Sequence, residues 1–392
     1  MSGFARLGAF APHLSRATQS PVTPIDRYAN LSSRAVKRAI QRTEGHNRRP
    51  YRGLSKGWID ESLSDKGRLS EPRGQYQRHC RPDFSLEHWP CACLTMSDIK
   101  TLERMLMSDF KTIRYNDPVN GVARIVLARP EKRNAQTMEL LAELNAAFDK
   151  AAQDPKAKVI VLAGEGRDFS SGHAGLGELD LETYQPTSTW PVTGFDDPGQ
   201  EGPWGIEQEF YLGFCWRWRN LPKPTIAEVQ GWVIAGGLML MWPMDIIIAA
   251  EDAKFTDPVV AFGVNAVEYC AHPWEMGIRK AKEMLFTGEV MTAEEAKEVG
   301  MVNHVVARED LTSFTMNMAE KIAKRPSMGL KLAKESVNQA QDAQGFWTAL
   351  QGAMSLQQLG HAHARLKHDG MAVDPEGQKA IHEIVSAWKT KA

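Results

Sequence analysis

Short apolar strands alternate with helical segments through most of this chain, and this alternation is the feature that most restricts its fold. The segments ARIVLARP (123–130) and AKVIVLAGEG (157–166) have the apolar composition of buried strands. Between them, residues 137–154 place apolar side chains at helical spacing. The same rhythm of strand, turn and helix returns within 224–255 and 292–306. Repeated units of this kind predict a layered α/β core.

The charge of the chain divides it near Met96. Residues 1–96 contain 16 Lys and Arg against 8 Asp and Glu, whereas the other 296 residues contain 31 against 40. The leading part is rich in Arg, Ser, Pro and Gly and has no sustained period, which is typical of disorder. Residues 311–341 and 345–368 read as amphipathic helices. We therefore expect three regions: a basic, disordered N-terminal extension (1–106), an α/β core (107–310) and a helical C-terminal region (311–392).

The cysteine content and the hydropathy of the chain indicate the cellular compartment in which we expect the protein. The five cysteines are few and odd in number, which favours reduced intracellular thiols over a disulfide framework. No run of 18 uncharged apolar residues occurs, so no membrane span is expected. Residues 1–25 contain Arg6 and Arg16 but no acid, as in a mitochondrial transit peptide. We expect a cytoplasmic protein, with the mitochondrial matrix as the alternative. A further alternative is that translation starts at Met96, Met105 or Met107.

The basic extension also raises the question of nucleic-acid and metal binding. Basic runs are more often solvated than bound to nucleic acid, so no nucleic-acid partner is expected. A cluster of potential zinc ligands has a C-x-C spacing rather than the usual C-x-x-C; it comprises His79, Cys80, His88, Cys91 and Cys93. We therefore predict no metal site.

Two glycine-bearing corners carry the first chemical signal. In WVIAGGLMLMWPMD (232–245), a strand turns into a helix near Gly236, which leaves unpaired backbone N–H groups with partial positive charge at the helix start. Glycine there lets a ligand oxygen approach the main chain. The turn RDFSSGHAGLG (167–177) similarly leaves the N–H of His173 free. Two converging N–H donors form an oxyanion hole.

Several segments together resemble one known family. They are RPEKRNAQ (129–136), FSSGHA (169–174), KPTIAEVQGWVIAGGLMLMWPMDIIIAAEDAKF (223–255), LFTGEVMTAEEAKEVGMVNHVV (285–306) and KLAKESVN (331–338). Between about 120 and 340 the chain is similar to the crotonase, or enoyl-CoA hydratase/isomerase, superfamily. The resemblance implies an α/β spiral of ββα units followed by a C-terminal helical trimerisation region. It also implies a homotrimer or a dimer of trimers that acts on an acyl-CoA thioester. Coenzyme A is then part of the substrate, and no cofactor is expected.

The resemblance also implies main-chain binding sites. The thioester oxygen would be held by the backbone N–H groups of His173 and Gly236, which stabilise an enolate. Coenzyme A would bind near residues 132–135, which are Lys132, Arg133, Asn134 and Ala135. The C-terminal segment 368–385 lacks the basic run that many relatives direct at coenzyme A, so Lys367 is a further candidate for its phosphates.

The catalytic acids are where the sequence departs from the family. Typical hydratases carry two glutamates at the positions that Met239 and Val259 occupy here. Water addition needs a base and an acid, which these apolar residues cannot supply. Asp257 is the first candidate substitute, because in an extended segment its side chain projects on the same side as Val259. Its alternative role is that of an Asx turn or helix cap before Pro258.

Glu268 is the second candidate for the catalytic acid or base. His272, four residues later, would share a helical face with it and titrate near neutral pH, although a packing role for this histidine is also open. We expect Trp232, Met239, Val259 and His272 around the acyl pocket. Glu228, within an apolar strand, must either contact a basic partner or face a wet pocket.

The resemblance, together with these candidate residues, implies an enoyl-CoA hydratase-like lyase. Residues 174–221 should form the lid and wall of the acyl pocket, and their aromatic density favours a bulky acyl group. The same segment contains several acids, among them Glu201 and Glu207. An enoyl-CoA isomerase or a C–C hydrolase of CoA esters, which needs only one base, is the alternative enzyme. A non-catalytic acyl-CoA-binding protein that lost both glutamates is the alternative outside catalysis.

Overall fold

The computed structural model describes residues 110–391 except 176 and 188–193. The expected N-terminal extension, the transit-peptide segment and the cysteine–histidine cluster at 79–93 therefore lie outside the described residues. Within the described residues, no helix combines the length and the apolar character that crossing a membrane requires.

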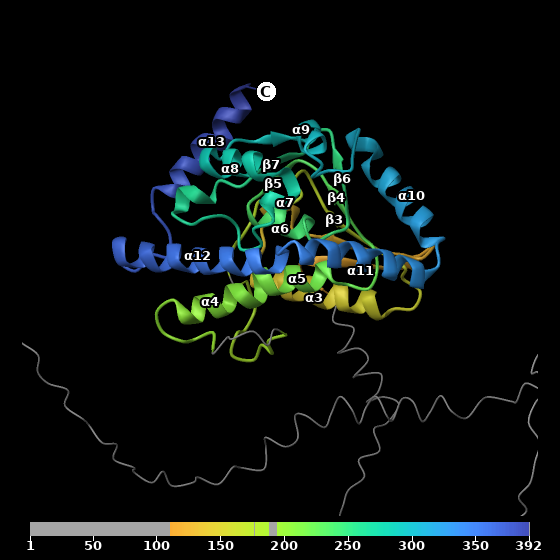
Figure 1. The fold of residues 1–392 in the computed structure, drawn as a ribbon, viewed down its shortest axis with the longest axis horizontal. Helices are drawn as coiled ribbons and strands as arrows, with labels where there is room; N and C mark the ends of the chain where they lie inside the picture. The colour runs from red at the N-terminus through yellow and green to blue at the C-terminus, as the bar shows by residue number, and fades with distance from the viewer. Residues whose placement is uncertain (1–109, 176, 188–193, 392) are drawn as a thin grey trace, which may run out of the picture. The chain divides into compact units, whose positions relative to one another are not determined.

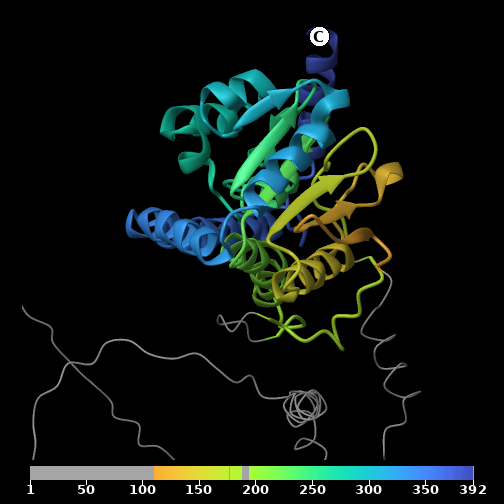
Figure 2. The same ribbon diagram turned by 90° about the vertical axis from the view of Figure 1, so that its right-hand side faces the viewer.

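A six-stranded sheet forms the centre of the α/β core (Figures 1 and 2). Its strand order is β1-β2-β3-β4-β6-β9, and every neighbouring pair except β1 with β2 is parallel. The strands are β1 (Ile113–Val119), β2 (Val122–Leu127), β3 (Val159–Gly164), β4 (Thr225–Val229), β6 (Ile246–Ala250) and β9 (His304–Val306). The predicted strands at 123–130 and 157–166 correspond to β2 and β3, which pair directly.

A smaller sheet stands beside the first and carries one of the glycine corners. Its order is β5-β7-β8, with β5 parallel to β7 and β7 antiparallel to β8. The strands are β5 (Trp232–Ile234), β7 (Lys254–Thr256) and β8 (Met291–Thr292). Two sheets flanked by helices confirm the predicted layered α/β class.

Helices cover both faces of the large sheet. On one face, α3 (Met138–Gln153) buries Leu140, Leu144 and Phe148 at helical spacing in the main apolar core. On the other face, α10 (Leu311–Ala323) lies across the strands and packs on Val159, Val161 and neighbouring valines and isoleucines (Figure 2). The remaining helices of the core are α4 (Glu201–Glu207), α5 (Phe214–Arg219), α6 (Gly236–Met241), α7 (His272–Met276), α8 (Ile278–Thr287) and α9 (Ala293–Glu298). A π-helix, Gln208–Gly213, joins α4 to α5.

The C-terminal region is helical, as the sequence predicts, but the single helix expected over 311–341 is divided into two, with Pro326 directly before the second. It comprises α10, α11 (Ser327–Ala343), α12 (Phe346–Lys367) and α13 (Gly377–Lys391). Figure 1 shows α11 and α12 following one another across the molecule, next to α3 and α5, while α13 lies beside α8. The long α12 thereby brings its inward face, including Leu350 and Met354, onto the main core.

Glu228 is a buried acid of β4 with a basic partner. Its side chain is 4% exposed, and its Oε1 lies 2.8 Å from Nη2 of Arg124 on β2. The hydroxyl of Thr312 on α10 donates a second hydrogen bond to Oε1 at 2.7 Å. Of the two roles expected for Glu228, the structure therefore shows the ion pair, on the sheet face that α10 covers.

Removing only one partner of this pair should destabilise the fold. Arg124→Met leaves the Glu228 carboxylate buried and uncompensated, so we expect a loss of about 3 kcal/mol in the free energy of unfolding. The double variant Arg124→Met/Glu228→Met removes the buried charge and should recover most of that loss. Urea denaturation of the three proteins measures both effects. Equal stability of the single variant and the unmodified protein would show that the pair contributes nothing.

Candidate active site

The two glycine corners lie against each other. β5 ends at Ile234, and Ala235 turns the chain into α6 with a positive φ of 47°. Gly172, with φ of 95°, sits so close that a Cβ atom there would lie 2.9 Å from the Ile234 carbonyl oxygen and 3.5 Å from the Gly236 nitrogen. A Cβ atom on Gly236 would in turn overlap the His173 ring. Both corners therefore require glycine because they approach each other.

Backbone hydrogen bonds fix the first corner between two elements. The Gln136 amide donates to the Gly172 carbonyl at 2.8 Å, and the Ala174 amide donates to the Gln136 carbonyl at 2.7 Å. On the other side, the Ile234 amide donates to the Ser170 carbonyl at 3.1 Å. Within the described part of the chain, the amides of His173 and Gly236 donate no hydrogen bond. This arrangement leaves the two predicted oxyanion-hole donors available to a ligand.

A cavity of about 400 Å³ opens beside these corners. Its wall is formed by the corners themselves, by the loop 258–268, by the end of α4 with the following π-helix, and by α12 and α13. A larger cavity of about 700 Å³ lies between α11 and the segment 242–247, but it contains neither glycine corner. The smaller cavity is therefore the candidate active site.

Glu268 points an unpartnered carboxylate oxygen into this cavity. The residue is 4% exposed, and its Oε2 has no hydrogen-bond partner within the described residues. That atom lies 3.9 Å from Nε2 of His173, and Oε1 accepts a hydrogen bond from Nε2 of Gln357 at 3.4 Å. Burial, followed by the nearby charge of Glu207, raises the pKa of Glu268 well above its ordinary value. Glu268 is thus placed to hold and donate a proton near the glycine corners.

Glu207, the last residue of α4, is a second carboxyl in the same wall. Its Oε2 accepts a hydrogen bond from Nε2 of Gln358 at 2.6 Å, and its Oε1 lies 3.4 Å from Nε2 of His361. Burial raises the pKa of Glu207, while attraction to His361 opposes that rise. Single ligand atoms of Glu207, Glu268 and His361 all lie within 4.8 Å of one another. From the sequence, Glu207 is expected only as one of the acids of the lid segment, and no pattern singles out His361.

His173 combines an expected main-chain role with a ring that lies in the cavity wall. The ring stacks on Tyr211, with 4.0 Å between the ring centroids and 1° between the planes. Burial lowers the pKa of His173 to about 4, so the imidazole is neutral at pH 7. Its side chain keeps 25% exposure toward the cavity. A neutral ring beside Glu268 can exchange a hydrogen bond with that carboxyl without adding charge.

Asp257, the first candidate from the sequence, lies in the interior rather than in the cavity wall. It is fully buried and accepts hydrogen bonds from the amides of Val267 at 3.1 Å and Val259 at 3.4 Å. Its Oδ2 lies 3.0 Å from Nε2 of His272. The extended geometry assumed for this segment is absent, because β7 ends at Thr256 and a 3-10 turn begins at Val259. The Asx-type alternative describes the observed contacts, so Asp257 ties the loop that leads to Glu268.

His272 is the buried partner of Asp257. It does not share a helical face with Glu268, since α7 begins only at His272. The Trp242 ring packs edge-on against it at 4.7 Å between centroids, and Cys270 Sγ lies 3.6 Å from its Nδ1. Burial lowers the pKa of His272, but the contacts with Asp257 and Cys270 more than offset this and raise it to about 9.

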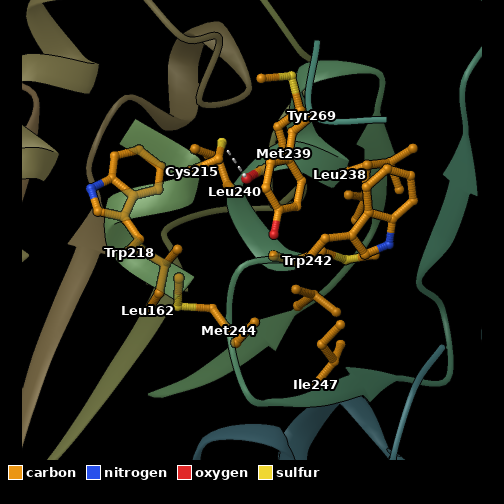
Figure 3. Close-up of a cluster of buried hydrophobic side chains, with 14 of the residues drawn as sticks. Leu162, Cys215, Trp218, Leu238, Met239, Leu240, Trp242, Met244, Ile247 and Tyr269 are labelled. Atoms are coloured by element: carbon orange, nitrogen blue, oxygen red, sulfur yellow. Dashed lines mark hydrogen bonds between the residues drawn. The ribbon is translucent and has the colours of Figure 1, made fainter. Parts of the chain in front are cut away.

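Of the four residues expected around the acyl pocket, one lines the cavity and three are buried elsewhere. Val259 lines the cavity. Met239 is 2% exposed and packs in the core near Cys215, whose thiol donates to the Met239 carbonyl at 3.2 Å (Figure 3). Trp232 and His272 are also buried and do not line the cavity.

The predicted coenzyme A segment forms a tight turn in which its residues differ in role. Asn134 is fully buried; its Oδ1 accepts from the Arg129 amide at 2.9 Å and its Nδ2 donates to the carbonyls of Glu165 and Asp168. Lys132 is exposed, and the Arg133 side chain is 46% exposed, with its Nε 3.6 Å from the Asp168 carboxylate. Asn134 thus shapes the turn, while Lys132 and Arg133 remain accessible. Their contact with coenzyme A stays a prediction.

The His272–Asp257 contact should make stability depend on pH. The pKa of His272 is raised to about 9 from about 6.5 in the unfolded chain, so its contribution is complete below about pH 6.5 and is lost as pH rises through 9. We expect a decline of at most about 3 kcal/mol in the free energy of unfolding across that window. His272→Gln should flatten the decline, whereas His382→Gln, at an exposed position, should not. Urea denaturation at several pH values tests this, and identical pH profiles for all three proteins would contradict it.

Comparison with known proteins identifies the family. The chain matches the enoyl-CoA hydratase/isomerase family model over residues 117–192 and 205–380. It is 43% identical over 261 residues to EchA13 of Mycobacterium tuberculosis, named as a candidate enoyl-CoA hydratase, covering 65% of this chain and 82% of that protein. It is 30% identical over 226 residues to the 1,2-epoxyphenylacetyl-CoA isomerase of Escherichia coli, covering 56% of this chain and 80% of the isomerase.

A solved structure agrees with this assignment. The crystal structure of a probable enoyl-CoA hydratase from Mycobacterium smegmatis is 45% identical, covers 67% of this chain and 99% of its own, and aligns with a TM-score of 0.59. The family match extends over both glycine corners and the two carboxyls of the cavity. The chain therefore belongs to the enoyl-CoA hydratase/isomerase family and has the crotonase fold.

Proposed function

We propose that this protein is an enoyl-CoA hydratase-type enzyme, a lyase that adds water across the double bond of an enoyl-CoA thioester. The observation that carries the proposal is the convergence of two carboxyls, the half-buried Glu207 and the buried Glu268, on the cavity beside the paired glycine corners. Hydration needs one group to activate water and another to protonate the α carbon. The family's usual positions hold Met239 and Val259, and this pair supplies the missing chemistry from other elements.

The environments of the two carboxyls suggest separate roles. Burial raises the pKa of Glu207, which makes it a stronger base, and the hydrogen bond from Gln358 orients its carboxylate; together these suit Glu207 to accept a proton from water. Glu268 has the raised pKa of a carboxyl that keeps its proton, so it suits the acid that protonates the α carbon. The thioester oxygen would accept hydrogen bonds from the amides of His173 and Gly236, which stabilise the enolate formed after water adds.

The size and lining of the cavity support a smaller acyl group than the aromatic content of 174–221 suggests. Of the aromatic residues of 174–221, Tyr211 lines the cavity, whereas Phe214 and Trp218 pack in the main core. A volume of about 400 Å³ lies toward the small end of ligand pockets. The apolar part of the wall, including Phe262 and Ile381, suits a hydrocarbon chain or a single ring.

An isomerase is the second candidate function. The E. coli relative is named an isomerase of a CoA ester, and moving a double bond needs only one base. Glu268 alone, 3.9 Å from the His173 ring, would meet that need.

Trimeric assembly and cytoplasmic location remain predictions. Apolar side chains that face outward on the C-terminal helices support self-association: Met328, Leu332 and Val337 on α11, and Leu356, Leu359 and Leu366 on α12.

Substituting each carboxyl should separate the hypotheses. For hydration, Glu207→Gln and Glu268→Gln should each lower kcat by at least about 100-fold, because acid and base are both required. For isomerisation, only Glu268→Gln should do so. Mass spectrometry of products from a panel of enoyl-CoA and β-keto-CoA thioesters identifies the reaction, and circular dichroism controls for folding. Full turnover by both variants would refute the proposed site, and tight CoA-ester binding without product would favour the non-catalytic alternative.

The oxyanion hole can be tested without changing a titratable group. Gly236→Ala adds a Cβ that overlaps the His173 ring and approaches Gln136 Oε1 at 3.0 Å, so the two amides should separate. We expect kcat to fall by about 100-fold, as for loss of one oxyanion donor. Gly329→Ala on α11, where a Cβ meets no atom within 4 Å, is the matched control and should leave kcat unchanged. Unaltered kcat in Gly236→Ala would place the thioester carbonyl elsewhere.

A further inference from the structure

We propose that Glu207, Glu268 and His361 form a binding site for a zinc-class divalent cation, and that the bound cation inhibits the enzyme. This inference rests on the proposed function for its inhibitory consequence, since the same carboxyls carry the acid and base roles there. The binding site itself depends only on the geometry of the cavity wall.

The first support is a concentration of carboxyl oxygen atoms at one point. Two carboxyls face each other here, and the Glu268 side chain is 5% exposed with its Oε2 lacking a hydrogen-bond partner within the described residues. Arg365 on α12 lowers the pKa of Glu207 through its charge, but its hydrogen bonds go to Gln200 and to the Gly370 carbonyl. A carboxyl pair that is largely shielded from water in this way is stabilised either by a proton or by a cation.

The second support is the orientation of His361. Its Nδ1 lies 2.6 Å from the Ala372 carbonyl oxygen, which can only accept a hydrogen bond, so Nδ1 carries a proton and donates it there. In the neutral ring, Nε2 then presents its lone pair toward Glu207 Oε1, 3.4 Å away. Metal-binding histidines are usually held in this way: one ring nitrogen donates a hydrogen bond to a group such as a backbone carbonyl, and the other binds the metal.

The third support is the spacing of the donor atoms. Bonds of about 2.1 Å to zinc, arranged tetrahedrally, separate neighbouring ligand atoms by about 3.4 Å. Here Glu207 Oε1 lies 3.4 Å from His361 Nε2, and the Gln357 amide nitrogen lies 3.5 Å from that same Nε2 and 3.4 Å from Glu268 Oε1. Reversing the Gln357 amide, whose Oε1 has no hydrogen-bond partner within the described residues, would put an oxygen at that fourth position.

The cation would bind the same carboxyl groups that the proposed reaction uses as acid and base. A cation held by Glu207 and Glu268 prevents either carboxyl from accepting or donating a proton, so turnover stops while it is bound. Because the ligands must be deprotonated, binding should strengthen as pH rises and should release protons. The cation thus competes with the catalytic proton for one position in the cavity wall.

Binding can be measured without any substrate. The full-length chain carrying Cys80→Ser, Cys91→Ser and Cys93→Ser, which removes competing thiols, is titrated with ZnCl₂ by calorimetry and with Co²⁺ by visible absorption. We expect one cation per chain, and at least about tenfold weaker binding after Glu268→Gln or His361→Gln in that background. His363→Gln, at an exposed position on the same helix, is the matched control and should bind as the background protein does. Circular dichroism checks folding, and having two separate variants protects the test from a folding defect in one.

An activity assay then separates this inference from the proposed function. Zn²⁺ should abolish hydration of the enoyl-CoA substrate, and a chelator should restore it. Equal affinity of the background protein and both variants for Zn²⁺ and Co²⁺ would overturn the cation site, even if the glutamate variants lose turnover as the proposed function requires. Specific cation binding in a protein that transforms no CoA ester would support the site and refute the proposed function. Binding with unchanged turnover would refute the inhibition.

Discussion

The close approach of two glycine corners is the constraint on which the rest of the site depends. Gly172 lies against the Ile234 carbonyl and the Gly236 nitrogen, so no side chain fits at either corner without moving the other. The approach is possible because Ser170 and Ile234 are joined by a backbone hydrogen bond at the edge of β5. The amides of His173 and Gly236 belong to this junction, and the carboxyls of Glu207 and Glu268 lie in the wall of the cavity that opens beside it.

Features encoded by short stretches of sequence were predictable. The buried strands at 123–130 and 157–166 follow from runs of β-branched residues, and they form β2 and β3 as expected. The glycine corners follow from local turn chemistry. The C-terminal helices follow from apolar periodicity. In each case the local structure is determined by residues that are close in the sequence, so a short segment is enough to predict it.

The carboxyl pair was only half predictable, because its geometry is set by contacts between distant segments. Glu268 is a candidate acid or base from the sequence, but Glu207 gains its proposed role from Gln358 and His361, which are about 150 residues further along the chain. The spacing of residues within α4 or within α12 does not indicate that Glu207 contacts Gln358 and His361. Asp257 shows the opposite limit: the 3-10 turn after Pro258 redirects a side chain that strict strand alternation would point into the pocket.

The wall contributed by α12 and α13 also has a consequence for truncated variants. Residues from Ser171 to Ile381 surround one cavity, so its enclosing surface is incomplete in any variant that lacks these two helices. Such a variant would keep the glycine corners but would lose Gln357 and His361 from the cavity wall. Shortening the chain from its C-terminal side therefore removes part of the candidate site as well as part of the core.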